Sequence, residues 1–229
     1  LISCNLAMLR LTRYFDTKTM RFDVDAYIAD VRVLLTCQDI LVDYASYPTE
    51  IGTEWTRANR ILGLSISDLG GLLMLRGLPY DSDEGRTFAK NIAALHFFAA
   101  YNHSTHMAES LGSCENYERN KDQVRKVFNK HRDTWTYVES STTESYLEEV
   151  VSTLISATSK NLDDFGIRNM QVVSYAPQGT TGMITDCYAT GPEPLIAIQS
   201  FKTLSGGGTV IQAPPVVALA MEAMGLDPE

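Results

Sequence analysis

The chain has 229 residues, of which 45% are hydrophobic and 21% are charged, and these values are typical of globular proteins. No apolar run approaches the roughly 20 residues that a membrane-spanning helix needs, and residues 1–4 lack the basic flank of a signal peptide. Nineteen basic and 28 acidic side chains give a net charge of -9, which disfavours binding to duplex nucleic acid. The composition therefore predicts a soluble protein with no membrane partner.

The first quarter of the chain alternates extended and helical patterns. Residues 1–15 are apolar with partial alternation, which predicts a buried strand or extended segment that ends in a polar turn at 16–18. The next stretch predicts a helix over 24–45 with Asp23 as its N-cap, because apolar side chains recur there at helical spacing. The short apolar run over 61–66 predicts a strand. The apolar positions of the predicted helix are Tyr27, Val31, Leu34, Leu35, Ile40 and Leu41.

Helical patterns continue into the middle of the chain. An apolar turn initiated by Asp68 predicts a short helix that ends near Gly77. Asp81 and Glu84 fit a capping box, with Asp81 as the N-cap, and they precede the longest predicted helix, over 83–111.

Two more helices are predicted before residue 162. Charged side chains of both signs alternate over 119–131 and predict a solvated helix. A Ser/Thr-rich loop follows at 140–145, and an amphipathic helix runs from Leu147 to near Asn161.

The last quarter of the chain is predicted to contain a strand, two loops and a helix. The strand covers 171–175 and leads into a Pro/Gly/Thr turn at 177–182. The SGGG segment at 205–208 predicts a flexible or tight loop, and a last helix covers 216–224 with Gly225 as its stop. Strands separated by helices favour an α/β architecture, and neither a repeat nor a linker divides it.

The four cysteines, Cys4, Cys37, Cys114 and Cys187, lie far apart without a CxxC pair, which is typical of a reducing compartment and predicts a cytoplasmic location. Cys37 lies within a predicted amphipathic helix and is expected in the core, whereas Cys114 follows a helix stop and is expected to be a partly exposed structural thiol. Cys4 lies in an apolar strand, where a small buried side chain is the ordinary interpretation and redox chemistry the alternative. The role of Cys187 stays open.

The turn APQGTTG, residues 176–182, directly follows the predicted strand. It concentrates backbone N–H donors, the hydroxyls of Thr180 and Thr181, and glycines that allow close approach of an anion. These features are typical of a phosphate cradle and also of a plain structural turn, and the spacing matches neither GxxxxGK[ST] nor GxGxxG.

Three histidines, His96, His103 and His106, share a predicted helical face that Glu109 could join, which superficially suggests a metal site. No second carboxylate-rich helix with ExxH spacing accompanies them, as a di-iron bundle would require. Because aromatic side chains surround them, we interpret these histidines as hydrogen-bonded core residues and assign no metal site.

Four segments, in this order, resemble the catalytic subunit of ribonucleotide reductases: SCNLAMLRL (3–11), RANRILGLSISDLGGLLMLRGLPYDSDEG (57–85), APQGTTG (176–182) and DCYATGPEPLIAIQSFKTLSGGG (186–208). The last segment most resembles the adenosylcobalamin-dependent class II. The resemblance implies one domain over residues 1–229, a helix-rich C-terminal part of the ten-stranded α/β barrel of these enzymes, completed by another chain or segment.

The resemblance also implies roles for individual residues. Cys4 matches the cysteine that pairs with a distant thiol to supply two electrons to the ribose of the substrate, forming a disulfide that must be reduced again after each turnover. Ser3 and Leu6 would lie beside the nucleotide. The loop that holds the substrate's phosphates would comprise Ala176, Pro177, Gln178, Gly179, Thr180 and Thr181.

The chain departs from the pattern of the family at several positions. Gln178 replaces the usual Thr of the phosphate loop, Ser65 replaces the second Gly of a Gly-Leu-Gly motif, and Met8 and Arg10 replace smaller or polar residues. The thiyl-radical cysteine and its finger loop, the second reductant cysteine, the effector region and the cysteine pair of the C-terminal tail have no counterpart in the 229 residues.

The resemblance therefore implies an enzyme component that acts with partners. We expect a chain that carries the N-terminal barrel half and the finger loop, a ribonucleotide substrate, adenosylcobalamin bound mostly by the missing part, and thioredoxin or glutaredoxin as reductant. A split reductase and a processed fragment both fit, and Leu1, which is not Met, is interpreted as a cut or processed edge. The alternatives are a class I reductase fragment and a non-catalytic binding or regulatory protein with the reductase fold; the sequence leaves a di- or triphosphate substrate open.

Overall fold

A computed structural model describes residues 2–137, 145–203 and 206–227. The contacts of the chain divide it into two compact units, each assembled from three segments. Unit 1 comprises residues 1–9, 24–65 and 87–175, and unit 2 comprises 10–23, 66–86 and 176–229. The expectation of a single domain over the whole chain stays a prediction.

The sheet of unit 1 pairs β1 (Asn5–Arg10) with β4 (Leu62–Ser67), so both predicted strands are present. β4 is shifted by one residue from its predicted bounds, whereas β1 is shorter than predicted and only its Leu9 is buried, which corrects the expectation of a buried strand. All six residues of β4 are buried, as in strands covered on both faces. The strand predicted over 171–175 is confirmed only in part, because Val173 forms a single parallel bridge with Leu64 of β4.

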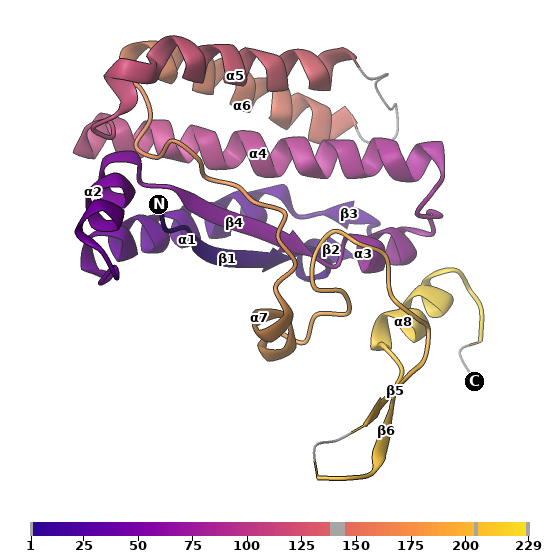
Figure 1. The fold of residues 1–229 in the computed structure, drawn as a ribbon. Helices are drawn as coiled ribbons and strands as arrows, with labels where there is room; N and C mark the ends of the chain where they lie inside the picture. The colour runs from indigo at the N-terminus through magenta and orange to yellow at the C-terminus, as the bar shows by residue number, and fades with distance from the viewer. Residues whose placement is uncertain (1, 138–144, 204–205, 228–229) are drawn as a thin grey trace. The chain divides into compact units, whose positions relative to one another are not determined.

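Five helices belong mainly to unit 1: α1 (Val24–Tyr44), α2 (Glu50–Asn59), α4 (Asp83–Leu111), α5 (Tyr117–Tyr137) and α6 (Ser145–Asp164). Figure 1 shows α4 between the strands and the α5–α6 pair. This central place explains why α4 buries both apolar and polar side chains around its circumference instead of one apolar stripe. The buried residues of α4 include Phe88, Asn91, Ile92, Leu95, His96, Phe98, Asn102, Ser104 and Thr105.

Helix α2 was not predicted from the sequence. Its N-cap is Thr49, whose hydroxyl accepts a hydrogen bond from the Gly52 N–H at 3.1 Å. It ends at Arg60, which adopts a left-handed conformation with φ of 50°. The four other helices of unit 1 are confirmed, although α5 and α6 are longer than predicted. Residues 138–144, which include most of the predicted Ser/Thr-rich loop, lie outside the described residues.

The first turn of α4 corrects the predicted cap. The hydroxyl of Ser82 accepts a hydrogen bond from the Gly85 N–H at 2.9 Å, so the N-cap is Ser82 and not Asp81. Because α4 begins at Asp83, the residue directly before the helix is Ser82, and its N–H partner Gly85 lies three residues further on.

Two predictions about the cysteines are wrong. Cys37 is exposed, because the buried stripe of α1 includes Leu35 and Val42, and Cys37 lies beside it. Cys114 is buried, and its backbone N–H donates to the carbonyl of Ile167 at 3.0 Å. Burial raises the pKa of the Cys114 thiol to about 11. All four cysteines are free thiols.

Unit 2 is built from short elements: the 3₁₀ helix η1 (Leu11–Tyr14), β2 (Phe15–Asp16), β3 (Arg21–Phe22), α3 (Leu69–Arg76), α7 (Gly179–Ile184), β5 (Ser200–Thr203), β6 (Thr209–Gln212) and α8 (Pro215–Ala223). The core of this unit packs α3 against α8 through Leu75, Val216 and Ala220. The predicted stops Gly77 and Gly225 are confirmed, because both glycines have positive φ after a helix.

Two further turns of unit 2 match or refine the predictions. The polar turn at 16–18 joins β2 and β3, which pair antiparallel. The glycines at 206–208 lie between β5 and β6, which also pair antiparallel, while Ser205 lies outside the described residues. Within the described ranges, no helix has an apolar stretch long enough to cross a bilayer.

Candidate active site

Cys4 lies immediately before β1, on the same side of the extended chain as Leu6. Both side chains lie over Gly63 of β4: a Cβ added at Gly63 would lie 2.9 Å from the Cys4 sulfur and 2.6 Å from Leu6 Cδ2. A side chain at position 63 would therefore force Cys4 and Leu6 to move. Cys4 and Leu6 are both exposed, so this face of the strand is accessible to a ligand.

The environment of Cys4 favours the protonated thiol. The sulfur lies against Gly63 and Leu6 although the residue as a whole is exposed, and this partial burial raises the pKa of the thiol above its ordinary value of 9.0. The nearest acceptor is the carbonyl of Asn5, at 3.8 Å from the sulfur. At neutral pH Cys4 is thus a thiol that can release a proton together with an electron.

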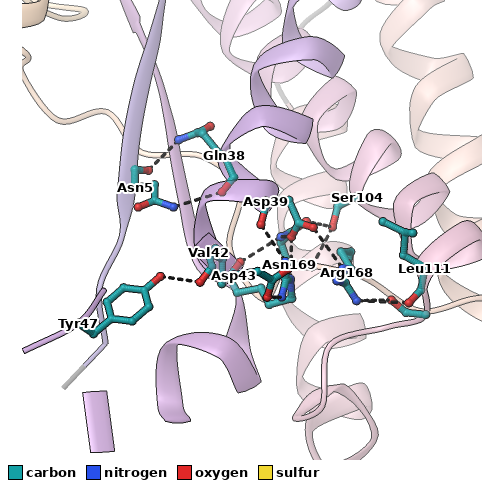
Figure 2. A network of polar contacts seen from close by, with 12 residues as sticks. Asn5, Gln38, Asp39, Val42, Asp43, Tyr47, Ser104, Leu111, Arg168 and Asn169 are labelled. Atoms are coloured by element: carbon teal, nitrogen blue, oxygen red, sulfur yellow. Dashed lines mark hydrogen bonds and ion pairs between the residues drawn. The ribbon is translucent and has the colours of Figure 1, made fainter. Parts of the chain in front are cut away.

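The backbone is held on both sides of Cys4. The N–H of Ser3 donates to Thr56 Oγ1 of α2 at 3.0 Å. The side chain of Asn5 donates to the carbonyl of Gln38 at 3.2 Å, and Gln38 Nε2 donates to the carbonyl of Asn5 at 2.7 Å (Figure 2). The second pair of bonds joins β1 to α1 reciprocally.

The predicted phosphate turn forms the short helix α7 and the residues before it. Pro177, Gly179, Thr180 and Thr181 are exposed, and a Cβ added at Gly179 would meet open space. The first N–H groups of a helix have no partner within it, so those at the start of α7 are available to an acceptor. The two threonine hydroxyls make no hydrogen bond to the residues that the structure describes.

Gln178 differs from its exposed neighbours because it is buried. Its backbone N–H donates to the carbonyl of Thr190 at 3.0 Å, and its carbonyl accepts from the Gly182 N–H at 2.7 Å. The first of these bonds ties the turn to the segment that follows α7, and the second closes the first turn of α7. Thr190 in turn donates to Glu193 Oε1 at 2.7 Å. Burial opposes the ionisation of Glu193, but its hydrogen bonds outweigh burial and lower its pKa.

Asp68 is a central residue of unit 2 that sequence reasoning did not identify as a site residue. Its carboxylate is fully buried and accepts the backbone N–H groups of Tyr188 and Ala189, both at 2.7 Å. The other oxygen of the carboxylate accepts from Arg10 Nε at 2.7 Å. Asp68 therefore does not cap α3 with its side chain, although it precedes that helix.

Arg10 completes the support of the turn. Besides Asp68, it donates to the carbonyl of Thr185 at 3.2 Å and lies over the ring of Tyr188, 4.3 Å from the centroid. Burial disfavours the charged guanidinium, but Asp68 outweighs this effect and raises the pKa of Arg10. Arg10 ends β1 and Asp68 directly follows β4, its neighbour in the sheet. Opposite charges at these two strand ends were the signal in the sequence that could have predicted the ion pair.

Cys187, whose role the sequence left open, lies in the same unit. Its sulfur is 3.0 Å from Ser67 Oγ and 3.2 Å from Thr185 Oγ1, and its backbone N–H donates to the carbonyl of Gly182 at 2.9 Å. These contacts give Cys187 a structural role behind α7.

A buried charged network supports the Cys4 side of unit 1. Asp39 accepts from Arg60 Nε at 2.8 Å, from Asn169 Nδ2 at 2.7 Å and from Arg168 Nε at 3.3 Å (Figure 2). Arg60 also forms two bonds with Asp43, at 2.8 and 2.9 Å, and these bonds lower the pKa of Asp43. The network connects α1 to the start of β4 and to the segment after α6.

The histidines each have a local partner. His96 is fully buried between the hydroxyl of Tyr27 and the carbonyl of Leu64, which confirms its predicted hydrogen-bonded core position. The core prediction is wrong for His106, which is exposed and pairs with Glu109, and His103 is only half-buried and pairs with Thr36. His131 stacks on Phe97. Among the described residues, no three His, Cys, Asp or Glu side chains gather as a metal site would require.

The structure thus describes the two halves of the predicted site separately. Unit 1 contains Ser3, Cys4 and Leu6, and unit 2 contains residues 176–181. The proximity of Cys4 to the turn, and the contact of each of these residues with a substrate, stay predictions.

The whole chain, residues 1–229, matches the family described as "Ribonucleotide reductase, barrel domain". Relatives named vitamin B12-dependent ribonucleotide reductase from Streptantibioticus cattleyicolor and Rhodopirellula baltica are 33% and 34% identical, over 99% and 98% of this chain. A ribonucleoside-diphosphate reductase large subunit from Arabidopsis thaliana is 26% identical over 91% of this chain. The chain spans 40%, 21% and 26% of the lengths of these three relatives.

Proposed function

Because this chain belongs to the ribonucleotide reductase barrel family, we propose that it forms the C-terminal part of the catalytic barrel of a B12-dependent ribonucleotide reductase. The observation that carries the proposal is the exposed thiol of Cys4 above Gly63, within a match that covers every residue of the chain. We further propose that the protein works in the cytoplasm, where a reducing pool keeps its four thiols free.

In this proposal Cys4 is one of two thiols that reduce the substrate. The ribonucleotide loses its 2′ hydroxyl as water, and two thiols lose two electrons and two protons as they form one disulfide. A thioredoxin-type dithiol then reduces that disulfide by exchange. The raised pKa of Cys4 fits this role, because the thiol must deliver protons as well as electrons.

The turn before and within α7 is assigned to the phosphates of the substrate. The exposed hydroxyls of Thr180 and Thr181 and the N–H groups of the first turn of α7 are neutral donors, so they suit an anion in a protein of net charge -9. Ala176, Pro177, Gln178 and Gly179 shape that turn, and Ser3 and Leu6 lie beside Cys4 at the proposed position of the nucleotide.

Adenosylcobalamin, when bound, supplies the radical that a cysteine thiol passes to the substrate. His96 is fully buried and both of its ring nitrogens are engaged, by Tyr27 and Leu64, so it does not fit the role of a ligand to cobalt. Following the resemblance, we assign most of the cofactor contacts, the radical cysteine and the base to another chain or segment, which also closes the ten-stranded barrel.

The experiment that tests the proposal uses the assembled reductase that contains residues 1–229. We expect Cys4→Ser to abolish multiple turnover supported by dithiol while nucleotide binding, measured by equilibrium dialysis, stays near the unmodified level. Activity should also depend on added adenosylcobalamin, whereas a class I fragment would need a separate radical-generating subunit. Unchanged multiple turnover in the Cys4→Ser enzyme would refute the proposed role.

A further inference from the structure

We propose that Thr56 and Gln38 are positioning residues for Cys4, which hold the backbone on either side of its thiol. The inference rests on the proposed function of Cys4 and adds residues that no motif of the sequence identifies. Neither side chain touches the sulfur; both act through the peptide groups of its neighbours.

Thr56 holds the residue before Cys4. Its side chain is 1% exposed, and its hydroxyl donates to the carbonyl of Gly52 at 2.6 Å. With its proton committed to the helix, the oxygen can only accept from Ser3, whose N–H lies 3.0 Å away. The direction of the Ser3 peptide is thereby set by helix α2.

Gln38 holds the residue after Cys4. It is 3% exposed, although it lies in a helix whose other buried side chains are mostly apolar. Its Nε2 donates to the carbonyl of Asn5 at 2.7 Å, while the side chain of Asn5 returns a bond to the carbonyl of Gln38 at 3.2 Å. Figure 2 shows these two amides facing each other across the gap between β1 and α1.

The other end of the Gln38 amide indicates that its role is not stability alone. The carbonyl of Asn5 can only accept, so it requires Nε2 on its side and leaves Oε1 on the other. Oε1 is buried and has no hydrogen-bond partner among the described residues. An apolar side chain at position 38 would remove this unpaired acceptor, which favours stability, but it would also leave the carbonyl of Asn5 without Nε2, which opposes it.

The sulfur of Cys4 depends on these two clamps. The contact of the sulfur with the carbonyl of Asn5 is long, at 3.8 Å, and Gly63 has no side chain that could pack against the sulfur. The two clamps hold the Ile2–Ser3 peptide through the Ser3 N–H and the Asn5–Leu6 peptide through the Asn5 carbonyl, so they fix both ends of the segment that contains Cys4 and restrict the direction of its Cα–Cβ bond. A displacement of about 1 Å at a reacting group can cost up to about 100-fold in rate.

The test compares two matched substitutions in the assembled reductase. Thr158 of α6 is also 1% exposed and donates to the carbonyl four residues earlier at 2.6 Å, but it holds no other segment. We expect Thr56→Val to slow single-turnover reduction, measured without added reductant, by about tenfold with an unchanged KM. Thr158→Val should lower the thermal midpoint as much as Thr56→Val does, but it should leave the single-turnover rate unchanged. Thr56→Ser, which keeps the hydroxyl, should have the single-turnover rate of the unmodified enzyme.

Gln38→Leu tests the second clamp independently. We expect its single-turnover rate to fall by a similar factor, while its thermal midpoint changes little, because removal of the unpaired Oε1 offsets the bond lost at the carbonyl of Asn5. The inference is overturned if Thr56→Val and Gln38→Leu turn over like the unmodified enzyme, or if Thr158→Val loses as much rate as they do. Retained turnover in Cys4→Ser would instead refute the proposed function, so the two failures are distinguishable.

Discussion

His96 shows what a single buried polar residue contributes to unit 1. The carbonyl of Leu64 can only accept, so His96 Nε2 carries the proton and donates to it at 3.1 Å, while Nδ1 accepts from the hydroxyl of Tyr27 at 2.7 Å. Burial lowers the pKa of His96 from its ordinary 6.5 to about 4. The folded protein therefore requires the neutral imidazole.

This requirement predicts a dependence of stability on pH. Between pH 6.5 and about 4 the unfolded chain binds a proton at residue 96 that the folded chain excludes, so stability is complete above pH 6.5 and falls as the pH drops toward 4. The slope from this group approaches about 1.4 kcal/mol per pH unit. Urea unfolding across this range should show a shallower slope for His96→Gln than for the unmodified protein.

His103 serves as the internal control of this experiment. Its pKa is also lowered to about 4, mainly by burial, and it remains in both proteins, so the variant should keep part of the slope. Equal slopes in the two proteins would contradict the assignment to His96.

Buried polar residues also mark the limit of sequence reasoning at this scale. The periodicity of α1 predicted core positions for Ile40 and Leu41, yet these side chains are 51% and 52% exposed, whereas Gln38 and Asp39 are buried. The partners of the two buried residues, Asn5 among them, are distant in the sequence. Periodicity reports which residues are apolar, and it carries no information about such partners.

At the scale of elements, α7 is where the sequence and the structure differ most usefully. Residues 179–182 of the turn predicted at 177–182 belong to the six-residue helix α7, and the segment after this helix returns to Gly182 through the N–H of Cys187 at 2.9 Å. The donors identified from the sequence are nevertheless in place, because a helix start presents N–H groups just as a turn does. The residues were predictable and the backbone geometry was not.

The proposed role of α7 predicts the effect of removing its hydroxyls. We expect the double variant Thr180→Ala, Thr181→Ala to raise KM for the ribonucleotide by at least about tenfold, because each hydroxyl is proposed to bond a charged phosphate. Stability to urea should change little, since both side chains are exposed. Thr153→Ala in α6 removes an equally exposed threonine and is the control. An unaltered KM would count against the phosphate role.

The long helices were predicted from their periodicity, whereas short elements were predicted only where an apolar run or a stop glycine marked them, as in β4, α3 and α8. The 21 residues of α1 and the 29 of α4 contain enough periodic positions to define a helix from the sequence. The 10 residues of α2 are mostly polar, and the four-residue strands β5 and β6 flank a glycine loop. None of these three elements was therefore predicted from the sequence. The one-residue bridge at Val173 shows the same limit.

At the scale of the whole molecule, unit 1 leaves large apolar side chains exposed to solvent. In the part of the chain that the structure describes, the β1–β4 sheet has two strands. Helix α1 exposes Val33, Ile40, Leu41 and Tyr44. Large exposed apolar side chains that cluster on one element are typical of an association surface. The family membership predicted from four motifs is confirmed over residues 1–229, and closure of the barrel stays a prediction.

This surface predicts an obligate association. We expect a polypeptide that carries the N-terminal barrel segments and the finger loop to form a stable complex with this chain, and the mixture to reduce ribonucleotides when neither part does so alone. Light scattering gives the mass of the complex. Leu41→Asp should weaken it, whereas Val127→Asp on α5, which replaces a side chain of similar exposure (49% against 52%), should not. Full activity of either part alone would contradict the prediction.

The ends of β4 carry a consequence for which substitutions this protein can accept. Arg60 before the strand and Asp68 after it both adopt left-handed backbone conformations, with φ of 50° and 62°. Glycine would relieve about 1–2 kcal/mol of backbone strain at such a position. It would also break an ion pair at each end: Asp39 would keep only its bonds from Arg168 and Asn169, and the half-buried Arg10 would lose its carboxylate partner. Removal of one partner of a buried ion pair costs about 3–5 kcal/mol. Glycine is ordinarily the safest replacement for a residue with a left-handed backbone, but at positions 60 and 68 it is unfavourable. We therefore expect neither position to accept glycine.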